Sequence, residues 1–229
     1  LRFPKKILFS FFDLPMIEHV RRRALMNTKN LRVIVATCDQ EIADVIQGYG
    51  GDVVFTNKNH LTGTTRVAEA IEKIDCSHVI LLQGDEPLIY PTYIDTVAGF
   101  ITSKPDVVAW NATAPINMED ELDRQSFVKC SLNPLGKILY FFRRTPSHQK
   151  FNSQKQYISK ILGIMAFRKE FLLKLVQLEQ SRLEKIESVE QFRIIENGFD
   201  IYSMPFSESL PSVNEPEEAW IIMDLLQKN

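Results

Sequence analysis

The sequence predicts an α/β fold in which a mostly parallel sheet is flanked by helices. Over about the first hundred residues, short apolar runs alternate with segments of helical period, the order typical of βαβ units. The apolar run 79–82 reads as a strand buried on both faces, and it leads straight into the polar turn 83–87. In the second half, strand-like runs are separated by longer, irregular links, which indicates an inserted β-rich lobe.

The elements of the first half follow from hydrophobic period and from proline and glycine positions. Pro15 precedes a helix whose apolar stripe contains Ile17, Val20, Ala24 and Leu25, and Gly48 closes the next helix. In order, we expect a helix at 16–25, a strand at 31–36, a helix around 42–46, a strand at 53–55, a helix at 64–74, a strand ending at Gln83 and a helix at 91–101.

The second half is expected to hold β-branched and aromatic strands first and helices afterwards. Residues 144–157 are polar and have no core period, so we predict a mobile loop there. We expect strands at 107–114, 128–132, 137–142, 161–167 and 201–204, and helices at 169–178, 187–197 and 215–227.

Composition narrows the function classes. Among 229 residues, 45% are hydrophobic and the net charge is −2, which argues against nucleic-acid and membrane-surface partners. The one dense basic cluster, 21–23, lies in a predicted helix and is expected to be a solvated face. No apolar run is long enough for a membrane span. Three scattered cysteines without a CxxC motif indicate a reducing compartment, which we expect to be the cytoplasm.

The turn 83–87 (Gln-Gly-Asp-Glu-Pro) is the strongest candidate for a functional site. In open α/β sheets, ligands bind outside the carboxyl ends of the strands. Asp85 stands at such an end, and Gly84 beside it allows close backbone approach, which suits a metal-bound phosphate. The alternative is an ordinary turn in which Asp85 and Glu86 are solvated.

Several further segments, in order along nearly the whole chain, carry a family resemblance. Together they resemble the 3-deoxy-manno-octulosonate cytidylyltransferases, also called CMP-Kdo synthetases. The matching segments are 2–8 (Arg-Phe-Pro-Lys-Lys-Ile-Leu), 14–17 (Leu-Pro-Met-Ile), 33–37, 60–66 (His-Leu-Thr-Gly-Thr-Thr-Arg), 83–87, 128–129, 139–143, 163–164, 189–193 (Val-Glu-Gln-Phe-Arg) and 213–218 (Val-Asn-Glu-Pro-Glu-Glu).

The resemblance implies a Rossmann-like, GT-A-like nucleotidyltransferase fold, with 1–229 forming a single cytidylyltransferase domain. It implies an enzyme that transfers CMP from CTP to a 3-deoxy-2-ulosonic acid, Kdo or a related acidic sugar, and releases pyrophosphate for bacterial surface polysaccharide synthesis. It also implies a Mg²⁺ cofactor and a homodimer.

On the nucleotide side, the resemblance assigns roles to matched residues. Lys6 would neutralise phosphate charge, and Asp85 would hold Mg²⁺, so these two are the candidate catalytic residues. Asn214 matches a second metal position. The candidate nucleotide-binding residues are Arg2, Lys6, Thr62, Gly63, Arg66 and Gln83. Read without the family, Lys6 is a solvated lysine and Thr62 is a helix N-cap next to a surface arginine.

On the sugar side, Lys129, Arg143, Glu190 and Gln191 are the matched candidates for binding the carboxylate and hydroxyls of the acceptor. A role at the rim of the core or on a helix surface is the alternative for each.

The chain departs from the family pattern at several places. The family has a strand and an Ile-Pro-Ala-Arg segment ahead of Arg2. Loss of this central strand would expose hydrogen-bonding groups and core, so we expect either a longer natural chain or a protein with impaired activity. Asn214 replaces an aspartate, Ile161 a histidine near the sugar, and Lys5 a glycine. Two alternatives therefore stay open: a cytidylyltransferase for a different acidic acceptor, and a nucleotide-binding paralogue without catalysis.

Overall fold

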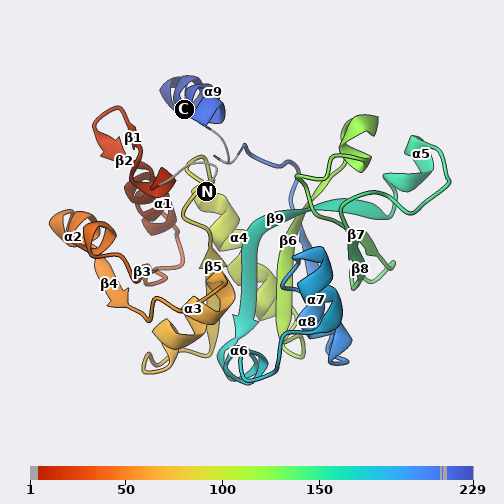
Figure 1. The fold of residues 1–229 in the computed structure, drawn as a ribbon, viewed down its shortest axis with the longest axis horizontal. Coiled ribbons are helices and arrows are strands. Elements are labelled where there is room, and N and C mark those ends of the chain that lie inside the picture. Colours follow the sequence, from red (N-terminus) through yellow and green to blue (C-terminus); the bar gives the residue numbers. More distant parts are fainter. Residues whose placement is uncertain (1–4, 212, 214–215, 229) are drawn as a thin grey trace. The chain divides into compact units, whose positions relative to one another are not determined.

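The structure is a computed structural model that describes residues 5–211, 213 and 216–228. The chain divides into two compact units. The first comprises the described residues of 1–74, 81–99 and 210–229, and the second comprises 75–80 and 100–209. Both units combine strands with covering helices, so the fold is mixed α/β, as the sequence predicts (Figure 1).

The first unit contains the βα alternation that the sequence predicts. Its short sheet pairs two parallel strands in the register Ile34↔Asp52 to Thr37↔Phe55. The elements are η1 (Lys6–Leu8), β1 (Ser10–Phe11), β2 (Leu14–Pro15), α1 (Met16–Leu25), β3 (Ile34–Thr37), α2 (Gln40–Gly48), β4 (Asp52–Phe55), α3 (Gly63–Ile71), the end of β5 (His78–Leu82), most of α4 (Pro91–Ser103) and α9 (Pro216–Lys228).

Helix α1 packs by the stripe predicted for it, with one exception. Ile17, Val20 and Ala24 are buried, whereas Leu25 is 46% exposed because it lies in the last turn. The prediction that 21–23 forms a solvated face is wrong for Arg21. Its guanidinium donates to the fully buried carboxylate of Glu18 at 2.6 and 2.8 Å. The basic cluster is therefore partly a structural ion pair rather than a binding surface.

Among the residues that the structure describes, two small hydrophobic cores lie in the first unit. Ile17, Ile42 and Ile46 join helices α1 and α2, with the partly buried Val35 and Val53 of the β3–β4 pair against them. A second core joins the antiparallel β1–β2 hairpin, which the sequence analysis did not predict, to the C-terminal helix α9. Its buried members are Phe11, Met16, Leu88, Val213, Ala219 and Ile222.

The second unit is built on a six-stranded sheet in the order β10-β6-β9-β7-β8, with β5 pairing β9 (Figure 1). Its elements are β6 (Ala109–Pro115), η2 (Glu119–Leu122), β7 (Lys129–Leu132), β8 (Ile138–Phe142), α5 (Phe151–Gln154), β9 (Ile158–Arg168), α6 (Lys169–Leu175), α7 (Arg182–Glu187), α8 (Phe192–Glu196) and β10 (Tyr202–Pro205). Helix α7 was not predicted.

This sheet corrects the expectation of a mostly parallel sheet. The pair β10–β6 is parallel, but β6–β9, β7–β9 and β7–β8 are all antiparallel. Strands β7 and β8 are joined by the short link 133–137, as antiparallel neighbours can be without a helical crossover, whereas β9 pairs with β6 and β7 across longer stretches of chain. The run 79–82 is also less buried than predicted: Leu81 is 3% exposed, while its neighbours on the strand are half-buried.

The predicted mobile loop 144–157 is held by internal contacts. It contains the short helix α5, and Gln154 of that helix is only 5% exposed. The Gln154 side chain accepts from Thr145 Oγ1 and donates to Gln149 O, each at 2.5 Å. A buried polar residue thus orders a segment that has no apolar period.

Within the described part of the chain, no helix is both long enough and apolar enough to cross a membrane. Cys38, Cys76 and Cys130 are free thiols. Burial raises the pKa of the Cys130 thiol to about 12, so this cysteine is an inert core residue.

Candidate active site

Lys6 and Asp85 lie 79 positions apart in the sequence and meet in the first unit. Lys6 Nζ donates to Asp85 Oδ2 at 2.5 Å and to the carbonyl oxygen of Val213 at 3.1 Å. The backbone N–H of Val213 in turn donates to the carbonyl oxygen of Asp85 at 3.3 Å. Both side chains keep some solvent access, 29% for Lys6 and 16% for Asp85. An ammonium and a carboxylate therefore stand together at a position that solutes can reach.

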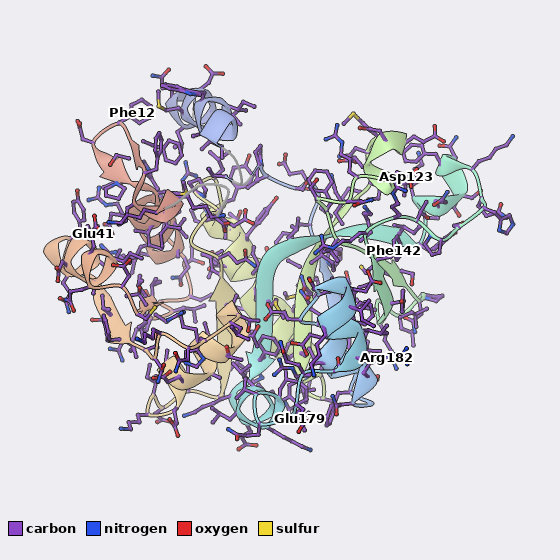
Figure 2. The ribbon with its side chains drawn as sticks, in the orientation of Figure 1. Phe12, Glu41, Asp123, Phe142, Glu179 and Arg182 are labelled. Carbon is purple, nitrogen blue, oxygen red and sulfur yellow. The ribbon has the colours of Figure 1, made fainter. Side chains whose placement is uncertain are left out.

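The backbone at Lys5 explains why the family pattern has glycine there. Lys5 adopts φ 53°, ψ 26°, a left-handed conformation that a side chain disfavours by roughly 1–2 kcal/mol. This residue turns the chain into η1 and so orients Lys6. The Lys5 ammonium forms an exposed ion pair with Glu41 of helix α2, which is labelled in Figure 2. Such a surface pair offsets little of the backbone strain.

Gly84 packs closely against helix α1 just after strand β5. A Cβ at this position would lie 2.8 Å from Ile17 Cδ1, so a larger residue would force the end of the Ile17 side chain to shift. The next carboxyl group along the turn, Glu86, is strongly perturbed. Burial, together with the negative charge of Asp85, raises the pKa of Glu86 to about 8. Two adjacent acids therefore share an environment that resists a second negative charge.

This arrangement fits a divalent cation. Asp85 offers the carboxylate oxygens that such a cation prefers, and a cation beside it would relieve the repulsion between Asp85 and Glu86. Asp85 Oδ2 now accepts from the Lys6 ammonium, so a cation would use the remaining lone pairs of the carboxylate or displace that ammonium. Among the described residues, no group of three or more histidine, cysteine, aspartate or glutamate side chains forms a ready-made metal cage. Arg2 and Asn214, two of the predicted site residues, lie outside the described residues.

The predicted nucleotide residues 62–66 form the start of helix α3. Thr62 is its N-cap, and its Oγ1 accepts from the backbone N–H of Thr65 at 3.3 Å. Arg66 donates to Thr56 Oγ1 at 2.7 Å, just past the carboxyl end of strand β4. The N-cap interpretation of Thr62 is thus correct, and it is compatible with a polar cradle at the helix start. Gln83 is exposed at the end of β5.

Of the predicted sugar residues, Lys129 and Arg143 form a cationic pair in the second unit. Lys129 is fully buried, and its ammonium donates to the carbonyl oxygens of Arg124, at 2.7 Å, and of Arg143. Burial lowers the pKa of Lys129 to about 8. The Arg143 guanidinium donates to the carbonyls of Gln125, Glu187 and Ser188 at 2.9, 3.2 and 3.3 Å. This geometry favours support of the backbone by Lys129 over direct contact with a sugar.

Glu190 and Gln191 lead into helix α8. Gln191 is the N-terminal flanking residue of the helix and is 9% exposed. Its Nε2 donates to Oδ1 of the fully buried Asn111 at 2.8 Å. Sequence reasoning missed Asn111 and the perturbation of Glu86. For Asn111, the sequence did offer one signal: a polar amide side chain inside the apolar strand predicted at 107–114.

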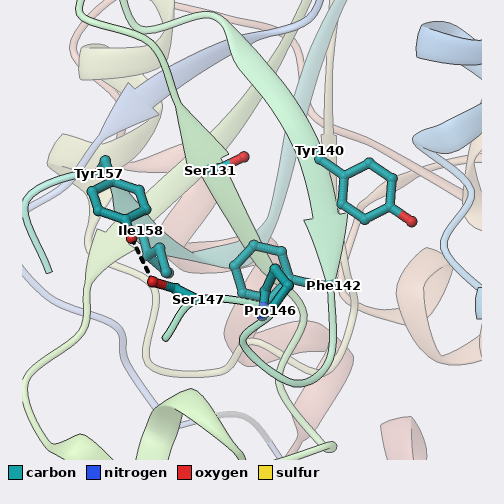
Figure 3. A pocket seen from close by; sticks show the side chains of 7 residues that line it. All are labelled: Ser131, Tyr140, Phe142, Pro146, Ser147, Tyr157 and Ile158. Atoms are coloured by element: carbon teal, nitrogen blue, oxygen red, sulfur yellow. Dashed lines mark hydrogen bonds between the residues drawn. The ribbon is translucent and has the colours of Figure 1, made fainter. Parts of the chain in front are cut away.

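A separate cavity of about 320 Å³ lies in the second unit (Figure 3). Three of its seven lining residues are aromatic, and the Tyr157 hydroxyl hydrogen-bonds Ser147 Oγ at 2.8 Å across one side. None of the predicted site residues lines this cavity, so it does not take part in the candidate site.

Comparisons with known proteins identify the family of this chain. Residues 1–201 match the family model described as cytidylyltransferase. A 3-deoxy-manno-octulosonate cytidylyltransferase of Chlorobium limicola is 36% identical over 100% of this chain and 93% of its own length. A relative of the same name in Arabidopsis thaliana, described as mitochondrial, is 32% identical over 99% of this chain and 79% of its own length.

Solved structures give the same result. The structure of a CMP:2-keto-3-deoxy-manno-octonic acid synthetase complexed with CTP has a TM-score of 0.92 and 32% identity, and it covers 99% of this chain and 93% of that one. A cytidylyltransferase from Leptospira borgpetersenii, at 16% identity and a TM-score of 0.66 over 100% of this chain and 82% of its own, shares the fold alone. The chain belongs to the cytidylyltransferase family, and within it to the 3-deoxy-manno-octulosonate cytidylyltransferases.

Proposed function

We propose that this protein transfers CMP from CTP to 3-deoxy-manno-octulosonate and releases pyrophosphate, as a step toward bacterial surface polysaccharide. The observation that carries the proposal is the Lys6–Asp85 pair, held by Val213 beside the end of strand β5. In the reaction, an oxygen of the sugar bonds to the α-phosphorus while the bond from that phosphorus to pyrophosphate breaks.

Lys6 and Asp85 have complementary parts in this chemistry. Negative charge grows on the phosphate oxygens in the transition state, and a preorganised ammonium stabilises it there. Lys6 supplies that charge, and its bond to Asp85 keeps it in place before CTP arrives. Asp85, with Asn214 as a second oxygen donor, would hold Mg²⁺, which supplies charge neutralisation of the triphosphate when bound.

The nucleotide is held by the first unit. We assign Thr62, Gly63 and Arg66 to the polar cradle at the start of helix α3, because backbone N–H groups there favour negative charge. Gln83, exposed after β5, is assigned to the base or ribose. Arg2 is proposed as a second phosphate contact.

The acceptor is recognised by residues of the second unit. Arg143, Glu190 and Gln191 are assigned to the sugar carboxylate and hydroxyls, and Lys129 is assigned to support of the Arg143 backbone. Binding a carboxylate would require the Arg143 guanidinium to exchange at least one of its present carbonyl partners.

A different acidic acceptor is the second candidate function, and Ile161 favours it. Ile161 stands on strand β9 opposite Thr113, and its side chain offers no hydrogen bond to a hydroxyl. The third reading, binding without catalysis, is favoured by the strained Lys5.

Pyrophosphate release with CTP and Mg²⁺ separates these readings. The parent chain is assayed with 3-deoxy-manno-octulosonate and with a panel of other acidic sugars, and Asp85→Asn serves as the inactive control. Preference for the first sugar supports the proposal. Preference for another sugar selects the second candidate, and CTP binding without turnover on any acceptor selects the third.

We further propose a homodimer in the cytoplasm. Light scattering coupled to size-exclusion chromatography measures the mass in solution, and a value near that of one 26.4 kDa chain would contradict the dimer.

A further inference from the structure

The pairing of strands β6 and β9 contains a bulge on the β9 side, and one buried amide of β6 satisfies it. Asn111 pairs with Met165 and Thr113 with Ile161, so residues 162–164 of β9 stand opposite a single residue of β6. The carbonyl groups of such a bulge lose their usual ladder partners. Asn111, with no exposed surface, provides the replacement donor.

The surroundings of Asn111 determine which way its amide points. Its Nδ2 lies 2.9 Å from Ala112 O, 3.0 Å from Leu162 O and 3.3 Å from Ile164 O. If the amide were rotated by half a turn, Oδ1 would face three carbonyl oxygens, which can only accept hydrogen bonds. The amino group must therefore face the bulge, and Oδ1 must face the opposite side.

The orientation of the Asn111 amide in turn determines that of the Gln191 amide. Asn111 Oδ1 is an acceptor, so the group of Gln191 that lies 2.8 Å from it must be the amino group. The other neighbour of Gln191 Nε2 is the thioether sulfur of Met165 at 3.8 Å, a weak acceptor. With its amino group directed at these two acceptors, Gln191 has its carbonyl oxygen to offer to a ligand.

We propose that Asn111 is a positioning residue that fixes the polarity of the Gln191 amide, so that Gln191 accepts a hydrogen bond from a hydroxyl of the sugar acceptor. The inference rests on the proposed function, because it takes Gln191 as a residue that touches the sugar. It also specifies the direction of the hydrogen bond: the sugar hydroxyl donates to the carbonyl oxygen of Gln191. A sugar that carries an acceptor-only group at that position should therefore bind less well. The polarity originates in the backbone carbonyls of the β6–β9 bulge.

A double-mutant cycle in the KM for the sugar tests the link. Gln191→Ala is expected to raise this KM roughly tenfold, the usual effect of one lost neutral hydrogen bond. Asn111→Ala should raise it by a similar factor and leave the KM for CTP unchanged. If Asn111 acts through Gln191, the double variant matches Gln191→Ala alone. Independent, multiplied effects on the sugar KM would overturn the proposal.

Thr113→Val is the matched control. Thr113 lies on the same strand, is 1% exposed, and shares a 2.7 Å hydrogen bond with Ser203 that does not involve Gln191. Its loss should lower thermal stability as Asn111→Ala does, without changing the sugar KM. An equal rise of the sugar KM in Thr113→Val would show that general loosening of the sheet, rather than amide polarity, is responsible. If Asn111→Ala does not fold, Asn111→Thr, which keeps one donor for the bulge but is too short for Gln191, takes its place in the cycle.

A second measurement needs no turnover. In the folded parent, the side-chain amide protons of Gln191 should exchange with solvent at least about tenfold more slowly than those of a free glutamine, because they are hydrogen-bonded and shielded. Asn111→Ala should remove this protection, as seen by NMR. Unprotected amide protons in the parent would refute the fixed polarity. If instead the protection is present but the parent makes no product from 3-deoxy-manno-octulosonate, the proposed function fails along with the sugar contact, and the amide polarity stands.

Discussion

At the scale of single residues, the site is set by groups that would be unfavourable elsewhere. Lys5 adopts a left-handed backbone conformation, and the pKa of Glu86 is raised to about 8. Backbone strain and strongly shifted pKa values cluster at functional sites, where charged groups have to be held in place for chemistry. Both features lie within the sequence neighbourhood of the Lys6–Asp85 pair, which strengthens the assignment of that pair as the reactive centre.

Replacing Asp85 tests that centre directly. Asp85→Asn should lower CMP transfer by about a hundredfold or more, because removal of one group that stabilises transition-state charge costs roughly 3–4 kcal/mol. Pyrophosphate release at saturating CTP and sugar is the measurement. Asp95→Asn, at a half-buried carboxylate that accepts hydrogen bonds from Thr28, is the control and should keep parental activity. Parental turnover in Asp85→Asn would remove this residue from the mechanism.

The strain at Lys5 can be measured by two substitutions that both lose the pair with Glu41. Lys5→Gly relieves about 1 kcal/mol of left-handed strain but adds a similar conformational freedom to the unfolded chain, so its unfolding free energy should stay close to the parental value. Lys5→Val should be less stable than Lys5→Gly by about 1 kcal/mol or more, because a β-branched residue tolerates positive φ poorly. Chemical denaturation compares the two, and equal stabilities would show that the left-handed turn is not maintained in solution.

At the scale of elements, buried polar groups hold the irregular segments of the second unit. Gln154 orders residues 144–157, and Lys129 joins the backbone of Arg124 to that of Arg143. Each satisfies carbonyl groups that have no partner in a helix or strand, which is how irregular backbone becomes stable inside a fold.

The role of Gln154 leads to a prediction about the segment it orders. Gln154→Ala should make residues 144–157 more sensitive to limited proteolysis, since the contacts with Thr145 and Gln149 are lost together. Gln156→Ala is the matched control, because the Gln156 side chain is exposed and donates a single hydrogen bond, to Asn152 O at 3.3 Å. Equal cleavage rates in the two variants would contradict an ordering role for Gln154.

Lys129 should give the stability a defined pH dependence. Its pKa is about 8 in the folded protein, below the ordinary value of 10.5 that it regains on unfolding. Between these two values the unfolded chain binds more protons, so the contribution of Lys129 to stability rises as the pH increases from about 8 to about 10.5. The unfolding free energy of the parent minus that of Lys129→Met should therefore increase across this window. A difference that is flat or decreasing would mean that Lys129 is not desolvated.

At the scale of the whole molecule, the residues that we assign to the nucleotide lie in the first unit, and those that we assign to the acceptor lie in the second. A ligand that binds only the folded protein stabilises it by about 2.7 kcal/mol at a hundredfold excess over its dissociation constant. CTP with Mg²⁺ should therefore raise the melting temperature of the parent, and the increase should be smaller in Asp85→Asn. Calorimetry measures both, and an equal increase in the two proteins would separate Asp85 from nucleotide binding.

Local pattern was enough to determine many of the elements. Hydrophobic periodicity and the positions of proline and glycine predicted helix α1, the helix stripe of Ile42 and Ile46, and the strands of the second half. These signals are local, because each lies within a few residues of the element that it predicts. The family could be recognised for the same reason: its motifs are short segments, and their order along the chain carries the information. Lys6, Asp85 and Gly84 were all singled out in this way.

Tertiary structure alone decided which residues meet. The contact of Lys6 with Asp85 and Val213, the antiparallel pairing of β9 with β6 and β7, and the seating of Gln191 on Asn111 join positions far apart in the sequence. Nothing local distinguishes a solvated lysine from the buried Lys129, because burial is a property of the assembled core. The direction in which an amide presents its oxygen is likewise set by carbonyl groups of another strand, so the chemistry of Gln191 can be read only once the chain has folded.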